Sequence, residues 1–164
     1  MKRNRHRRSQ RTRAIPRTPG AEKDYVVIIQ CHIAKERCSG YFCEKAFHDR
    51  TGGFAAYARD KPYRVLSMTC GGCCGKSVHR RLTHLVRKLK KYDGMDKGQV
   101  VVHLASCMTK DNFHSPRCLF VDYIRELVAR VGLACREDTH ISPAAEAHRA
   151  AGLYRKRRKR STHT

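Results

Sequence analysis

The residues Cys70-Gly71-Gly72-Cys73 separate two segments of different periodicity, and they decide the fold. Residues 63–69, before them, have the alternating and β-branched pattern of a strand. The segment after them has one apolar helical face that ends near residue 92 and is formed by Val78, Leu82, Leu85, Val86 and Leu89. Two thiols are therefore expected in a glycine turn before a helix N-terminus, whose partial positive charge favours thiolates.

Two other segments, residues 25–30 and 99–105, are continuously apolar, as is typical of strands buried on both faces of a parallel sheet. Residues 133–137 form a weaker fourth strand. Helices are expected between the strands, at residues 41–49, after the glycine turn and from Cys118 to Gly132, with further short ones at 54–58 and 144–154.

This order predicts a three-layer α/β fold with a four-stranded parallel sheet, of the flavodoxin- or Rossmann-like kind. The first strand should lie between the second and the third, because the side chains that follow these strands are expected to converge. Ligands should then bind at the carboxyl ends of the strands.

The positive charge is concentrated at the two ends of the chain. Residues 1–20 hold eight Lys or Arg and residues 149–164 hold seven, and neither segment contains Asp or Glu. Residues 21–148 hold the other 21 Lys or Arg and all 14 Asp or Glu. We expect a disordered basic tail at 1–22, one α/β domain at 23–142, and a C-terminal helix with a second basic tail at 143–164. The tails could bind nucleic acid non-specifically through its phosphates.

The nine cysteines indicate the environment of the protein. Their odd number and the lack of a signal peptide argue against a secreted disulfide framework, so a cytoplasmic protein is expected. No run approaches the ~20 apolar residues of a membrane span, so no membrane partner is expected. The sequence does not identify a protein partner.

Soft metal ligands follow the ends of all four predicted strands. Cys31, Cys70, Cys107 and His140 each lie within a few residues of a strand's carboxyl end. The full set of candidate ligands is Cys31, Cys38, Cys43, Cys70, Cys73, Cys107, Cys118 and His140, twice what one tetrahedral zinc takes. Two ions, one iron–sulfur cluster with spare thiols, or one metal site surrounded by further cysteines would account for them. We expect Cys70 and Cys73 to hold one ion with Cys31 and Cys107, and we expect Cys38, Cys43 and Cys118 to form a second site or to be reserve ligands.

The remaining cysteines and histidines have other expected roles. Cys74 and Cys135 are expected to be buried as small apolar side chains. Of the histidines, His103 should be a hydrogen-bonded core residue, and His79 and His84 should face solvent. His32 and His114 lie in loops near the expected site as further candidates for a ligand or proton carrier.

Two other functions fit part of the pattern. A strand followed by Cys-x-x-Cys and a helix is also the context of a thiol–disulfide oxidoreductase that would use Cys70 and Cys73. Gly75-Lys76-Ser77 imitates a phosphate-binding loop, but the first glycine of that motif is replaced by Cys70, so a nucleotidase is rejected while anion binding at this helix start stays open.

Together these motifs resemble the CGGC domain family. The resemblance covers residues 25–140 and rests on separated segments: Cys70–Cys73, the early cysteines with Ala46-Phe47, Gly53-Phe54 and Tyr57, residues 102–107, Cys118, and Thr139-His140. It implies a metal site, with zinc suggested, and implies no reaction. Cys74 stands where the family usually has proline, which argues against Cys74 as a ligand.

Overall fold

The computed structural model describes residues 24–154, and both basic tails beyond these residues lie outside it. The described chain forms a four-stranded parallel sheet of order β2-β1-β3-β4. The strands are β1 (Tyr25–Gln30), β2 (Arg64–Thr69), β3 (Val100–Leu104) and β4 (Ala134–Glu137). The predicted fold class and the central place of the first strand are confirmed.

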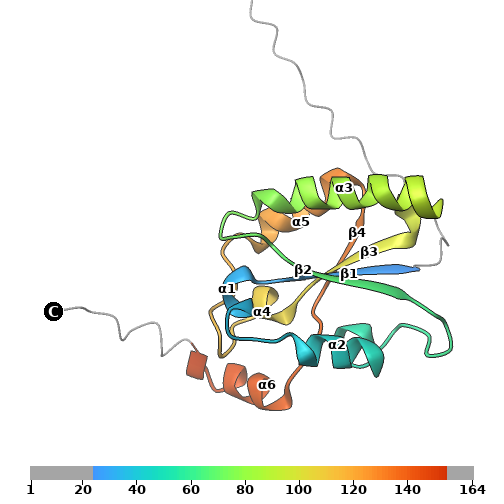
Figure 1. Ribbon diagram of the computed structural model, residues 1–164. Coiled ribbons are helices and arrows are strands. Elements are labelled where there is room, and N and C mark those ends of the chain that lie inside the picture. Colours follow the sequence, from blue (N-terminus) through green and yellow to red (C-terminus); the bar gives the residue numbers. More distant parts are fainter. Residues whose placement is uncertain (1–23, 155–164) are drawn as a thin grey trace, which may run out of the picture.

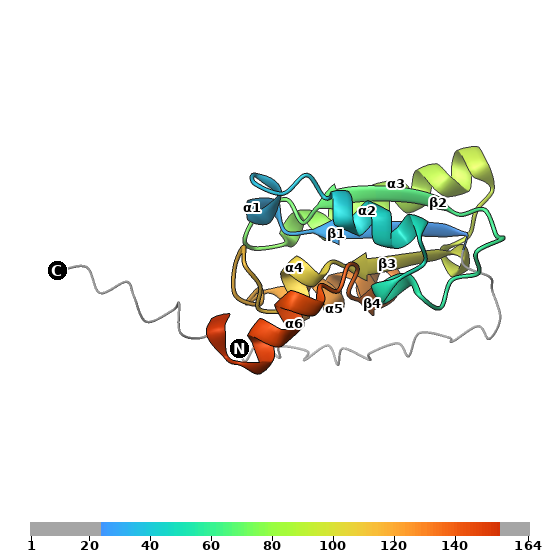
Figure 2. The same ribbon diagram turned by 90° about the horizontal axis from the view of Figure 1, so that it is seen from below.

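Helices form a layer on each face of the sheet. Figures 1 and 2 show α3 (Lys76–Asp93) and α5 (Val121–Val131) on one face, and α2 (Tyr41–His48) and α6 (Pro143–Ala150) on the other. The short helices α1 (His32–Lys35) and α4 (Ser106–Thr109) follow β1 and β3, and 3₁₀ turns occupy η1 (Gly52–Phe54) and η2 (Lys97–Gln99). The expected helix at 54–58 is instead η1, a few residues earlier.

The alternation of side chains along the central strands creates two cores. Val27 and Ile29 of β1 pack with the apolar faces of α3 and α5, whereas Val26 and Ile28 pack with Phe47 of α2 and with residues of the following loop. Every residue of β1 and β3 is buried, as their continuous apolar sequence predicted. This double burial fixes the ends of β1 and β3 rigidly, and the candidate site lies just beyond them.

Among residues 24–154, no helix combines the length and the apolar character that crossing a bilayer requires.

Candidate functional site

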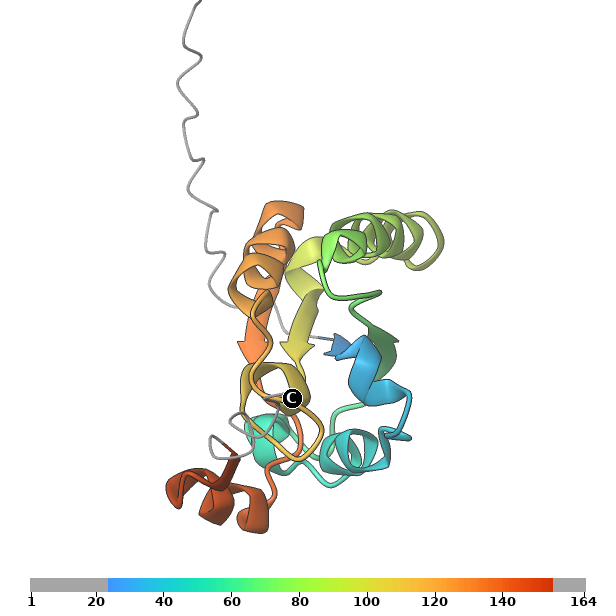
Figure 3. The same ribbon diagram turned by 90° about the vertical axis from the view of Figure 1, so that its left-hand side faces the viewer.

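The carboxyl edge of the sheet brings together cysteines that are far apart in the sequence. Cys31 follows β1 directly, Cys70 follows β2, and Cys107 lies in α4 after β3. Figure 3 looks toward this edge, where α1 and α4 stand in front of the strands. The convergence arises because parallel strands place their carboxyl ends on one side.

Cys31 and Cys107 are in direct contact. The backbone N–H of Cys31 donates a hydrogen bond to Cys107 Sγ at 3.4 Å. Burial raises the pKa of Cys107 to about 12, and negative charge on Cys43, Cys31 and Cys38 adds to the rise. Cys107 is therefore a neutral thiol near pH 7, with Cys31, Cys38 and Cys43 as neighbours; we call these four residues the Cys107 group.

Cys118 has a different set of thiol neighbours. Burial raises the pKa of Cys118, and negative charge on Cys31, Cys70 and Cys73 raises it further. A hydrogen bond from the Phe120 backbone lowers this pKa but does not cancel the rise. The backbone N–H of Cys118 donates to the carbonyl of Met108 at 2.9 Å, which holds the loop against α4. These four residues, Cys31, Cys70, Cys73 and Cys118, form the Cys118 group, and Cys31 belongs to both groups.

The turn that contains Cys70 and Cys73 has the conformation that its glycines predicted. Gly71, Gly72 and Gly75 have φ of 82°, 125° and 61°. The turn is fixed to α3 because the Ser77 hydroxyl donates to the Cys70 carbonyl at 2.8 Å. Within the turn Cys70 is buried, whereas Cys73 and Cys74 are exposed. The expectation that Cys74 is buried was wrong, because the turn projects it from the helix start into solvent.

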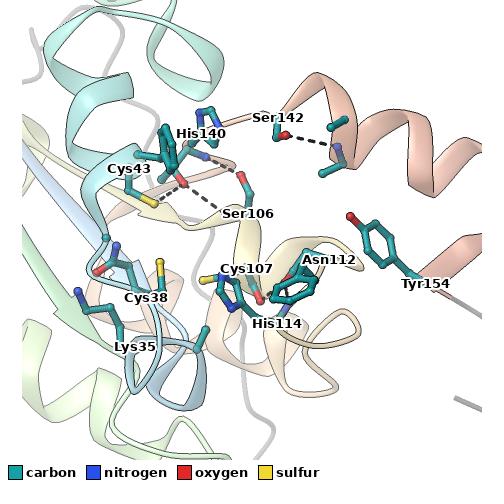
Figure 4. Close-up of a pocket in the computed structure, with 18 of the residues that line it drawn as sticks. Lys35, Cys38, Cys43, Ser106, Cys107, Asn112, His114, His140, Ser142 and Tyr154 are labelled. Carbon is teal, nitrogen blue, oxygen red and sulfur yellow. Dashed lines mark hydrogen bonds between the residues drawn. The ribbon is translucent and has the colours of Figure 1, made fainter. Parts of the chain in front are cut away.

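A pocket of about 560 Å³ opens beside the Cys107 group. Figure 4 shows Cys38, Cys43 and Cys107 on its wall, with Lys35, His114 and Tyr154 around them. Its walls come from the segments that follow β1, β3 and β4 and from α6. Cys70, Cys73 and Cys118 do not line this pocket.

Thr139 connects one wall of the pocket to the sheet edge. Its hydroxyl contacts Cys43 Sγ at 3.2 Å, its N–H donates to Ser106 Oγ at 3.1 Å, and the Ser106 N–H donates back to the hydroxyl. Its carbonyl accepts from the Gly53 N–H at 2.8 Å. These contacts fix Cys43 relative to α4 even though Thr139 and Cys43 are far apart in the sequence.

The candidate histidines have separate environments. His140 lies in the pocket wall, stacks on Phe42 with ring centroids 4.9 Å apart, and has a pKa lowered by burial. His114 also lines the pocket, and His32 Nδ1 lies 3.4 Å from Thr69 Oγ1. His103 is buried and hydrogen-bonded, and His79 and His84 are exposed, as predicted.

The donor atoms suit a soft metal, but their present arrangement does not enclose one. Within residues 24–154, no three His, Cys, Asp or Glu side chains form a group that could hold a metal ion. All nine cysteines belong to this part of the chain, and all are free thiols. Thiolates are ligands of zinc and of iron–sulfur clusters, so binding would require the thiol side chains to turn toward one another.

Several lining residues were not identified from the sequence. Ser106 and Thr139 lie in segments that carry the family resemblance but were given no role, and Gln30 and the α6 side of the pocket gave no motif, because their proximity depends on tertiary packing. A signal was available only for α6 itself, which has Ser142 as N-cap and Pro143 at its first position.

Comparison with known proteins gave one match. The sequence model described as CGGC domain matches residues 25–140. No curated protein and no solved structure showed significant similarity to the chain.

Proposed function

Because the chain belongs to the CGGC domain family, we propose that it is a cysteine-rich metal-binding protein. Zinc is the proposed metal, and an iron–sulfur cluster is the alternative. The observation that supports this proposal is the position of Cys31 directly after β1, where its backbone N–H contacts Cys107 Sγ and where negative charge on it also raises the pKa of Cys118.

The two thiol groups suggest how the proposed ligands divide. Cys31, Cys70, Cys73 and Cys118 supply four sulfurs, the number that one tetrahedral zinc takes. From the sequence we expected Cys107 in this set and Cys118 in reserve; the charge interactions of Cys118 with Cys31, Cys70 and Cys73 favour exchanging the two. Cys38, Cys43 and Cys107, with His140 nearby, then form the candidate second site.

The residues of the chain determine what metal uptake requires. Burial raises the pKa of both Cys107 and Cys118, so each thiol must give up a proton to become a ligand. The bound metal would supply a cross-link between the segments that follow β1, β2 and β3. Metal affinity should accordingly rise with pH.

The proposal is tested by metal analysis of protein purified without oxygen. Zinc, iron and acid-labile sulfide are measured in wild type, Cys73→Ser and Cys74→Ser, since residues 73 and 74 are adjacent exposed cysteines. We expect Cys73→Ser to lose metal and thermal stability, while Cys74→Ser keeps both. A metal-free wild type reconstituted without binding zinc or iron would refute the proposal.

The same turn favours a second candidate function, that of a thiol–disulfide oxidoreductase. Cys73 is exposed and Cys70 is buried, so one thiol can reach a partner while the other is protected. The Cys73 thiolate would attack a partner disulfide and displace one partner thiolate. Cys70 would then attack the Cys73 sulfur of the mixed disulfide and release the second partner thiolate. The Cys70–Cys73 pair is then oxidised by two electrons to a disulfide, and the partner holds two thiols. Metal-free protein with a reversible Cys70–Cys73 disulfide would favour this function.

Nucleic acid is a further proposed partner, because a basic surface exists on α3 in addition to the tails. The exposed side chains of α3 include Arg80, Arg87, Lys88 and Lys91, and within the described residues none of these four has an acidic partner. A reducing compartment such as the cytoplasm is proposed for the protein, since thiol ligands must remain reduced.

A further inference from the structure

The pocket lies where the connections of the sheet diverge. From β1 the chain passes to β2 on one side, whereas β3 lies on the other side of β1 and leads outward to β4. Lys35 and Cys38 follow β1, and Ser106 and Asn112 follow β3, and all four line the pocket. In open α/β sheets this divergence between neighbouring strands is the usual place for a ligand.

The size and walls of the pocket suit a small organic molecule. Its volume of about 560 Å³ lies within the ~300–1,000 Å³ that is typical of small-molecule sites. Phe42, which stacks on His140, and Phe113, which packs edge-on against His114, line the pocket and are still 59% and 71% exposed, so a ligand can contact them there. Aromatic rings in a pocket wall favour a planar, apolar molecular body.

The charge of the walls is positive. No Asp or Glu is among the described lining residues, which include the cations Lys35 and Arg149. Arg149 is already paired with Glu146 and donates to the Asp111 carbonyl at 2.7 Å. Lys35 donates to the Ser39 carbonyl and retains two further N–H groups, so it is the cation available to an anionic ligand.

Gln30 gives an independent indication of a ligand. Its side chain lines the pocket and is only 4% exposed, yet no hydrogen bond joins its amide to another described residue. The amide atoms are not fully enclosed by protein, so they face the pocket and are available to pair with a polar group of a ligand. Gly40 leaves room for this amide, because a Cβ there would stand 2.8 Å from Gln30 Nε2.

We propose that this pocket binds a small planar organic acid. The planar body would lie between the aromatic walls, the acid group would face Lys35, and a polar substituent would pair with Gln30. The assignment goes beyond the metal proposal and does not depend on it. The chain after Tyr154 is an unsuitable occupant, because its next six residues are all Lys or Arg and the pocket walls are cationic.

The charge preference is tested with three probes of one shape. The full-length protein, reduced and treated with a chelator, is titrated calorimetrically with 2-naphthoate, 2-naphthalenemethanol and 2-naphthylmethylammonium. We expect the carboxylate to bind at least tenfold more tightly than the alcohol, and the ammonium compound not to bind. Equal binding of all three, or binding of none, would overturn the proposal, whatever the metal content of the untreated protein.

The location is tested with a matched pair of variants on α6. Ala144 lines the pocket and is exposed, whereas Ala147 is exposed on the same helix and does not line it. Ala144→Trp should abolish 2-naphthoate binding and Ala147→Trp should leave it within twofold. Lys35→Gln should remove the preference for the carboxylate over the alcohol. Undiminished binding in a folded Ala144→Trp protein would place the probe elsewhere and refute the assignment.

Discussion

His103 is a buried ring whose two nitrogens have complementary partners. Nδ1 lies 3.0 Å from the Asp138 carbonyl, which can only accept, so Nδ1 is the protonated nitrogen. Nε2 then accepts from the Tyr57 hydroxyl at 2.8 Å. The sequence predicted this core histidine from its place in an apolar strand, but Tyr57 and Asp138 as its partners could not be inferred, because they lie on other segments.

The first prediction concerns acid stability. Burial lowers the pKa of His103 below its usual value of 6.5, so its contribution to stability is present above about pH 6.5 and is lost as pH falls through the lower folded pKa. Urea unfolding between pH 7.5 and 4.5 should show this loss. It should be smaller in His103→Leu and unchanged in His84→Gln, whose histidine is exposed.

The second prediction concerns alkaline stability. The folded pKa of Cys107 is raised to about 12 from 9.0, so its contribution is present below pH 9 and is lost as pH rises toward 12. Metal-free, reduced protein should therefore lose stability, by up to about 1.4 kcal/mol per pH unit from this group, above pH 9. Denaturant unfolding at pH 8 to 10.5 should show a weaker dependence in Cys107→Ala than in Cys74→Ala.

At the scale of elements, the two glycines that flank α3 have the same backbone conformation and different surroundings. Gly75 precedes the helix with φ +61° and Gly94 follows it with φ +66°. A Cβ on Gly75 would stand 2.4 Å from Cγ1 of Ile124 on α5, whereas a Cβ on Gly94 meets nothing within 4 Å. Gly75 thus permits close packing of α3 and α5 as well as the turn.

The third prediction follows from that difference. Gly94→Ala should cost about 1–2 kcal/mol of unfolding free energy for its left-handed backbone. Gly75→Ala should cost about 1–3 kcal/mol more, because it also overpacks Ile124. Chemical denaturation of both variants gives the comparison, and the combination of Gly75→Ala with Ile124→Val should recover part of the loss. Equal costs at the two glycines would contradict this account.

The elements differ in how far their sequence determined them. β1 and β3 were predicted to within a residue, because continuous apolar runs fit only a doubly buried strand. The helix expected at 54–58 was misplaced for a tertiary reason. Gly52 and Gly53 approach the carbonyls of Thr139 and Asp138 so closely that a Cβ on either would lie 2.4 Å away. That contact, with a segment more than 80 residues later, fixes η1.

At the scale of the whole molecule, the sheet order could be predicted and the pocket could not. The order followed from the requirement that the ligands after β1, β2 and β3 converge. The pocket depends on where α6 packs, and α6 is held by Lys110 with Glu146 and by Arg149 with the Asp111 carbonyl. Such polar contacts between exposed segments have no periodic signal in the sequence.

The fourth prediction concerns the charge distribution of the whole chain. If α3 and the tails bind nucleic acid phosphates, affinity for a duplex should fall with salt, with a log–log slope of about −0.9 per contact. Replacing Arg80, Arg87 and Lys91 by Gln should reduce the slope, and deleting residues 1–20 should reduce it further.

A charge-matched control distinguishes a binding surface from a general basic charge. Arg37, Arg59 and Arg136 are also exposed but belong neither to α3 nor to α5, which packs against it, and their replacement by Gln removes the same charge. Fluorescence anisotropy with a labelled duplex at several salt concentrations measures all variants. Identical slopes for the two triple variants would show that α3 has no particular role.

The placement of α6 has a consequence for partial unfolding. The sheet is complete at Glu137, and α6 follows it in the chain. With α6 detached, β1 keeps both of its neighbours, while the cavity beside Cys38 and Cys107 loses the wall that Ala144, His148 and Arg149 provide. Detachment of this one helix would therefore open these thiols to alkylating reagents while the sheet stays intact.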